Sequence, residues 1–130
     1  MTFFSKPGRG GNKVQRISSV QTAVTNTGTY CALQGDFPPA FGIGRVLYHG
    51  SILAVATINI VGGAGVTGGT LQPLILGSDG TYRSYGNAIT AVVGALPLIS
   101  ILSPVTGVAV QITVAITGGS MYIETTGVIL

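Results

Sequence analysis

The chain has 130 residues, of which 46% are hydrophobic and 7% are charged, whereas charged residues make up about 25% of an ordinary soluble domain. This length corresponds to one domain of about 100–150 residues. The abundance of Val, Ile and Leu excludes a disordered chain, and the single cysteine, Cys31, excludes a disulfide scaffold. We therefore expect a folded domain whose surface is covered by uncharged polar side chains or buried against other chains.

The net charge of +3 is concentrated near the N-terminus. The first sixteen positions hold no acidic residue and four basic ones, Lys6, Arg9, Lys13 and Arg16. This stretch is rich in glycine and has no apolar period, so we predict an extended arm over residues 1–16 and a β-sandwich domain over residues 17–130. A basic arm can bind nucleic acid or an acidic protein surface, or remain solvated. We expect it to contact a neighbouring protein subunit rather than nucleic acid.

Short apolar segments separated by glycine and proline turns fill the rest of the chain, and none of them has a helical period. In chain order, we predict strands at residues 20–25, 29–34, 45–48, 52–60, 71–76, 81–85, 89–93, 98–102, 108–117 and 121–126. Many short strands with turn residues between them indicate an all-β fold. We predict an antiparallel β-sandwich, jelly-roll-like in type, rather than a barrel.

Residues 88–102 form the most apolar run of a segment, 84–123, that carries no charge. The run is 15 residues long and is interrupted by Gly94 and Pro97, so it falls short of the roughly 20 residues that span a bilayer. We interpret it as buried strands and expect no membrane partner. Phe3 and Phe4 precede the basic residues, which is not the order of a secretory signal.

Residues 108–117 alternate strictly between two kinds of side chain. We predict that one face of this strand packs in the core, namely Val108, Val110, Ile112, Val114 and Ile116. The opposite face carries only small or uncharged residues, namely Ala109, Gln111, Thr113, Ala115 and Thr117. A solvent-facing strand would more often carry Lys or Glu, which prevent unwanted pairing. We therefore predict that the opposite face contacts another subunit.

Motifs that would support catalysis are missing. Gly63, Gly65 and Gly68 match the G-x-G-x-x-G pattern, but the dinucleotide fingerprint needs a helix to begin there, and a second strand follows instead. We therefore interpret this segment as a glycine-rich hairpin loop. The single histidine, His49, the lone cysteine and the three acidic residues have no metal-ligand spacing. We expect a protein that is not an enzyme and has no cofactor or metal.

Two segments resemble a known family. Residues 69–82 read GTLQPLILGSDGTY and resemble the G-T-x-x-x-x-G-S-x-D-G-x-W hairpin of small β-sandwich modules in phage virion proteins, with Tyr82 in place of the usual Trp. Residues 104–123 read PVTGVAVQITVAITGGSMYI and resemble the closing strand pair of those modules, in which a glycine turn follows a strongly alternating strand.

The resemblance implies a capsid decoration protein, head fibre or tail component without enzymatic activity. Such a protein would be made in the host cytoplasm and located in the virion, where it would assemble with itself and with other virion proteins such as the major capsid protein. The alternative from a different class is a glycan-binding β-sandwich, in which Arg83 and Tyr85 share one face of their strand and contact a sugar.

Overall fold

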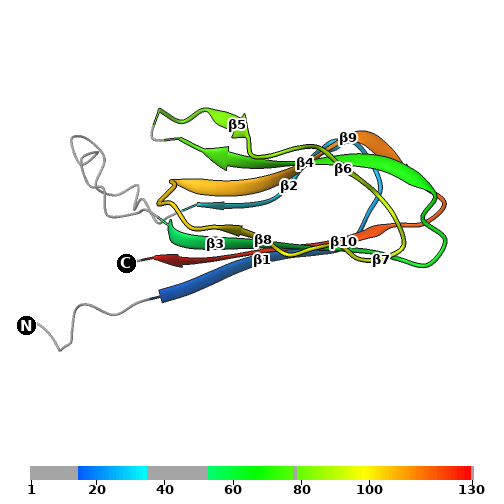
Figure 1. The fold of residues 1–130 in the computed structure, drawn as a ribbon, viewed down its shortest axis with the longest axis horizontal. Coiled ribbons are helices and arrows are strands. Elements are labelled where there is room, and N and C mark those ends of the chain that lie inside the picture. The colour runs from blue at the N-terminus through cyan, green and yellow to red at the C-terminus, as the bar shows by residue number, and fades with distance from the viewer. Residues whose placement is uncertain (1–14, 35–52, 78, 130) are drawn as a thin grey trace, which may run out of the picture.

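The computed structural model describes residues 15–34, 53–77 and 79–129 (Figure 1). These residues form ten strands: β1 (Gln15–Val24), β2 (Gly28–Gln34), β3 (Leu53–Gly62), β4 (Gly68–Leu76), β5 (Tyr82–Ser84), β6 (Ile89–Thr90), β7 (Gly94–Ala95), β8 (Ile99–Ile101), β9 (Gly107–Thr117) and β10 (Met121–Ile129). The predicted strand at 45–48 and most of the predicted arm lie outside the described residues. Arg16, which the sequence analysis assigned to the arm, lies in β1 and pairs with Val128.

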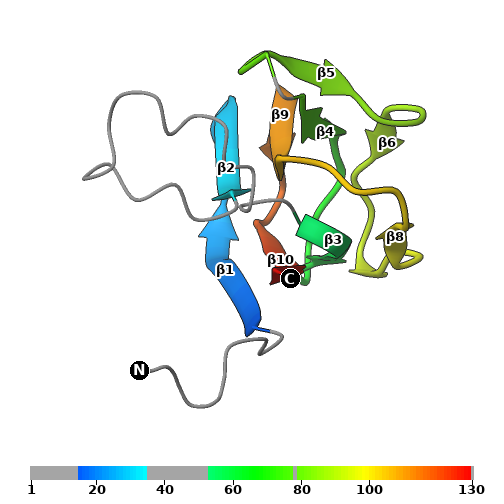
Figure 2. The ribbon, with the colours of Figure 1, turned by 90° about the vertical axis from the view of Figure 1, so that its left-hand side faces the viewer.

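The strands form two sheets that pack face to face (Figures 1 and 2). Sheet I has the order β1-β10-β3-β7, and β8 also pairs with β3. Sheet II has the order β2-β9-β4-β5, and β6 also pairs with β4. All of these pairs are antiparallel. The predicted antiparallel β-sandwich is therefore confirmed, and the strand order is that of a jelly roll.

Connections between successive long strands change sheet. Residues 25–27, 63–67 and 118–120 join β1 to β2, β3 to β4 and β9 to β10, and each passes from one sheet to the other. The jelly-roll order follows from these crossings. β9 and β10, which the sequence resemblance treats as a strand pair, consequently lie in different sheets. The true hairpin is β4–β5, whose turn contains Asp79 and Gly80 as predicted.

The G-x-G-x-x-G segment is one of these crossings rather than a hairpin loop. Its glycines lie against the backbone of the β9–β10 connection, where the Gly63 amide donates a 2.8 Å hydrogen bond to the carbonyl oxygen of Ser120. Gly118 has φ +82°, and a β-carbon there would overlap the carbonyl oxygen of Gly65. Glycine is needed here because two backbones meet without room for a side chain.

The core lies between the two sheets and is built from alternate residues of the facing strands. Its fully buried large side chains include Ile58, Ile60, Met121 and Ile123 from sheet I, and Leu71, Val110 and Ile112 from sheet II. Burying one such side chain contributes about 1.5–3 kcal/mol to folding. The β-branched residues of the sequence pattern fill this space because they pack well on a pleated surface.

Strand β9 is less regular than its sequence indicates. Its pairing with β4 shifts register twice, between Gly68 and Thr70 and between Thr70 and Leu71, and each shift adds a residue on the β9 side. Such bulges interrupt the alternation of faces. Val114 lies between the two shifts and is 56% exposed. Its predicted place in the core is therefore wrong, whereas the other four members of that face are buried.

The apolar run 88–102 is also more exposed than predicted. It crosses from sheet II to sheet I along the rim of the sandwich, because β6 pairs with β4 and both β7 and β8 pair with β3. Strands this short bring few residues to the core. The prediction of buried strands is wrong for Val92, Val93, Leu98 and Leu102, which are 45%, 57%, 59% and 73% exposed.

Candidate functional site

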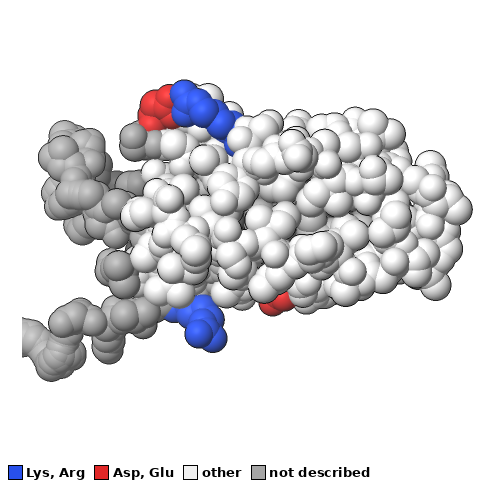
Figure 3. All heavy atoms as spheres, viewed as in Figure 1, with Lys and Arg blue, Asp and Glu red and all other residues white. Residues whose placement is uncertain are grey.

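The surface of the sandwich is almost free of charge. Four charged residues lie in the described part of the chain: Arg16, Asp79, Arg83 and Glu124. Figure 3 shows them at the upper and lower margins of the molecule, with uncharged surface between. A surface of this kind loses little solvation energy when another protein covers it. The two outer sheet faces are therefore the candidate functional sites.

The outer face of β9 was predicted as the subunit contact, and fewer of its residues are exposed than predicted. Thr113, Ala115 and Thr117 are exposed, and Gln111 is half-buried. Ala109 is wholly buried, so its predicted exposure is wrong; it pairs with Leu74 of β4, which is also buried.

The exposed threonines of this face have partners within the chain. The Thr113 hydroxyl donates a 3.4 Å hydrogen bond to the carbonyl oxygen of Thr70. The hydroxyl oxygens of Thr67 and Thr117 are hydrogen-bonded at 3.0 Å. These hydroxyl groups are partly satisfied by the fold itself. The end of the face that remains exposed can consequently be covered at a small desolvation cost.

The outer face of sheet I is a second surface, which the sequence analysis did not identify. Three rows of side chains run across β8, β3, β10 and β1, and a further row, Tyr122, Val61 and Ala95, continues the face on β10, β3 and β7. The three rows are Leu102, Val55, Val128 and Arg16; Ser100, Thr57, Thr126 and Ser18; and Leu98, Asn59, Glu124 and Val20. Leu98 and Leu102 flank β8 and share the side of Ser100, because they alternate with Ile99 and the buried Ile101. The sequence signal for this face is the alternation of Leu98, Ser100 and Leu102 with Ile99 and Ile101, in a run predicted as buried strands.

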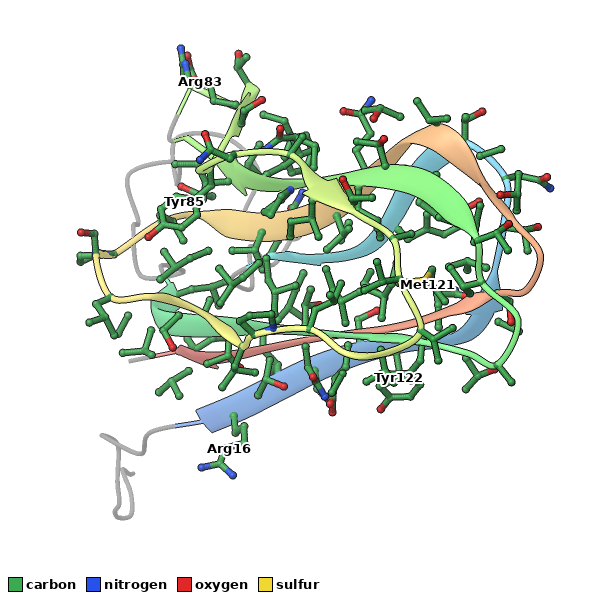
Figure 4. All side chains as sticks on the ribbon, turned by 45° about the vertical axis from the view of Figure 1, so that its right-hand side comes forward. Arg16, Arg83, Tyr85, Met121 and Tyr122 are labelled. Atoms are coloured by element: carbon green, nitrogen blue, oxygen red, sulfur yellow. The ribbon has the colours of Figure 1, made fainter. Side chains whose placement is uncertain are left out.

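Figure 4 confirms the direction of this face, since Arg16 and Tyr122 point away from the interior while Met121 points into it. The first row is mainly apolar and the third row is half apolar, with Val20 43% and Val55 38% exposed in addition to the two leucines. The middle row contains only Ser and Thr. The face thus combines apolar margins with a centre of small polar side chains.

Arg83 and Tyr85, the residues of the glycan alternative, do not converge on one site. Arg83 is engaged with Asp79, at 3.0 Å between Nη2 and Oδ2. The ring of Tyr85 packs against the core, and its hydroxyl lies 3.5 Å from the carbonyl oxygen of Ser100. In Figure 4, Arg83 lies at the tip of the β4–β5 hairpin, whereas Tyr85 lies at the edge of the core. The glycan alternative expected both groups to be free to contact a sugar, but the Arg83 guanidinium is paired with Asp79 and the Tyr85 ring packs against the core.

Asp79 stabilises the hairpin turn. The guanidinium of Arg83 and the backbone amide of Thr81, which donates a 3.0 Å hydrogen bond to Oδ1, hold the pKa of the Asp79 carboxyl below its ordinary value. Both partners are on the same hairpin, so this is a local turn interaction. It leaves no free carboxylate for acid–base chemistry at the hairpin.

Cys31 lies in a polar bridge between the sheets. It has φ +56° and occupies an irregularity in the β2–β9 pairing between Tyr30 and Leu33. The Thr125 hydroxyl on β10 donates a 2.8 Å hydrogen bond to the Cys31 carbonyl oxygen. The Cys31 thiol donates to the carbonyl oxygen of Ile123 at 3.3 Å. Burial raises the pKa of this thiol, so it is a structural group in a protected place.

The residues considered for catalysis do not assemble within the described part of the structure. His49 and Asp36 lie outside the described residues, as do Lys6, Arg9 and Lys13 of the predicted arm. Over residues 15–34, 53–77 and 79–129, no three His, Cys, Asp or Glu side chains are grouped as metal ligands. The same residues include no helix long and apolar enough to cross a membrane.

Comparisons with known proteins give a structural relationship. No protein-family model matches the chain, and no curated protein matches it by sequence. The SPBc2 prophage-derived protein YomS is similar in structure, with a TM-score of 0.54 and 12% identity over 93% of this chain and 99% of that one.

Two further solved structures are similar to a lesser degree. The disulfide-linked pili of Bacillus endospore appendages give a TM-score of 0.46 and 14% identity, over 99% of both chains. The infectious bursal disease virus Gx strain gives a TM-score of 0.29 and 14% identity, over 97% of this chain and 37% of that one. The fold comparison rests on the first structure: the chain shares its all-β architecture with a prophage-derived protein.

Proposed function

We propose that this chain is a non-enzymatic structural subunit of a phage particle, either a capsid decoration protein or another head- or tail-associated component. The observation that carries the proposal is the uncharged surface of the jelly roll. Its described part carries four charged side chains, two of which, Asp79 and Arg83, pair with each other. A protein that functions alone in solution needs more charge than this to remain dispersed.

Two parts of the chain would make the contacts in this proposal. The exposed end of the β9 face, Thr113, Ala115 and Thr117, would meet another copy or the major capsid protein. The basic arm, with Lys6, Arg9 and Lys13, would attach to a neighbouring subunit. The prophage origin of YomS agrees with a phage setting, and the resemblance of residues 69–82 to virion modules supports it independently.

The test is incorporation into particles. Thr113→Lys places a charge on the β9 face, and deletion of residues 1–13 removes most of the arm. We expect both variants to fold normally, with near-native thermal midpoints, and to be depleted from purified particles relative to the wild type. Absence of the wild-type protein from particles would refute the virion role. A hydrolytic or transfer activity that falls by about a hundredfold in His49→Ala would refute the non-enzymatic assignment.

A further inference from the structure

The outer face of sheet I has a symmetry that the virion role does not explain. Its first and third rows carry the apolar residues and the two charges, and its middle row carries Ser and Thr. Arg16 ends the first row on β1, and Glu124 lies in the third row on β10. Leucines therefore lie on both sides of the Ser and Thr row on β8, and the two opposite charges lie in opposite rows.

The two charges on this face do not pair within one copy. Arg16 pairs across the sheet with Val128, four residues along β10 from Glu124, which places the two backbones about 14 Å apart along the strands. Among the described residues the ion pair formed is that of Asp79 with Arg83, on the other sheet. Arg16 and Glu124 are thus opposite charges on one face, separated by too great a distance to meet.

We propose that the outer face of sheet I is a dimer interface between two copies of this chain, with each Arg16 reaching Glu124 of the other copy. The two-fold axis would lie in the contact plane, perpendicular to the strands, and would run along the middle row. This axis exchanges the first and third rows. Leu102 of one copy then faces Leu98 of the other. Arg16 of one copy faces Val20 on β1 of the other, and Glu124 of that other copy lies on the neighbouring strand β10, about 4.8 Å away across the sheet.

Several features of this face suit contact with a second copy of the chain. Ser18, Ser100, Thr57 and Thr126 at the axis are small, so the sheets can approach to the usual spacing of about 10 Å. The long Arg16 side chain can lay its methylene stem on Val20 while its guanidinium reaches the carboxylate. The two charges then bind in reciprocal pairs, which fixes the register of the contact.

The size of the face sets the expected strength. Four strands by three outer rows cover about 400 Å² in projection, about half of the roughly 800 Å² per partner of a standard interface. We therefore expect micromolar association. This inference rests on the self-association in the proposed function, but it places the contact on the sheet opposite to β9.

The experiment is sedimentation velocity on the full-length chain from about 1 to 200 µM, with charge exchange as the diagnostic. We expect Arg16→Glu and Glu124→Arg each to weaken dimerisation by about tenfold, because each places like charges together. The double variant Arg16→Glu/Glu124→Arg should return to near the wild-type affinity. Leu102→Lys should abolish the dimer, and Arg83→Glu, an equal charge change on the other sheet, should leave it intact. Circular dichroism checks that each variant is folded.

Three results would overturn the inference. The first is a wild-type protein that remains monomeric at 200 µM. The second is wild-type affinity in both single charge variants, and the third is a double variant that does not recover. A dimer that resists all the sheet I variants but is lost with Thr113→Lys would place the contact on β9. That result would refute this interface and leave the proposed virion role standing.

Discussion

The hydroxyl group of Thr125 should contribute measurably to stability, and Thr125→Val tests this with little change of shape. Thr125 is wholly buried, and its hydroxyl donates to the Cys31 carbonyl oxygen at 2.8 Å. Cys31 lies where the β2–β9 pairing is interrupted, so no register partner on β9 faces it. Valine keeps the volume of threonine and removes the donor. The Cys31 carbonyl oxygen then loses one of the two hydrogen bonds that link the sheets at this point.

The expected cost follows from leaving one buried acceptor unsatisfied, about 1–3 kcal/mol. For a domain of this length that lowers the thermal midpoint by about 3–12 °C. The chain has five tyrosines and no tryptophan, so urea unfolding is best followed by circular dichroism, at one fixed protein concentration. The denaturant midpoint should fall while the slope m stays unchanged.

The matched control is Thr29→Val on β2. Thr29 is exposed and pairs with Gln111 of β9, outside the two proposed contact surfaces, so its substitution should change the free energy of unfolding by no more than about 0.5 kcal/mol. Equal effects of Thr125→Val and Thr29→Val would refute the reasoning. Such a result would mean that the Cys31 carbonyl has another donor, or that the bridge between the sheets adds nothing to stability.

Three further outcomes are expected. Gly118→Ala should destabilise the protein by clearly more than Gly80→Ala. Both glycines have φ +82°, but a β-carbon at Gly118 would overlap backbone atoms, whereas none of the described atoms lies within 4 Å of a β-carbon at Gly80. Equal urea midpoints for the two variants would contradict the close approach of the backbones at Gly118. Burial raises the pKa of Cys31 above its ordinary value of about 9.0, so the neutral thiol stabilises the fold below that pH and this contribution is lost as pH rises through the folded-state pKa. Stability measured from pH 8 to about 10.5 should therefore fall more steeply in the wild type than in Cys31→Ala, and parallel curves would count against this. Asp79→Asn should leave the thermal midpoint unchanged in physiological salt, because the side chains of the Arg83–Asp79 pair are 60% and 53% exposed and asparagine keeps an acceptor for the Thr81 amide. A clear drop in the midpoint would show that the ion pair stabilises the hairpin.

The sequence alone determined the fold class and most of the strands. Alternation of apolar and polar residues is a local property, so β2, β4 and β9 could be predicted within three residues at each end, and glycine pairs located the turns. The scarcity of charge also pointed directly to a surface suited to contact with other chains. None of these inferences required knowledge of which strands pair.

The tertiary structure decided which faces are exposed. Two bulges in the pairing with β4 turned Val114 outward, and Ala109 is buried in the folded chain; alternation within β9 encodes neither. The short connection over residues 118–120 passes from one sheet to the other and separates β9 from β10, and the packing of the sheets brings Thr125 to Cys31, 94 residues away. The outer face of sheet I is assembled from four strands that are distant in sequence, so its symmetric rows exist only once the strands have paired. Periodicity gives each strand two faces, and the packing of the two sheets selects the one that remains outside.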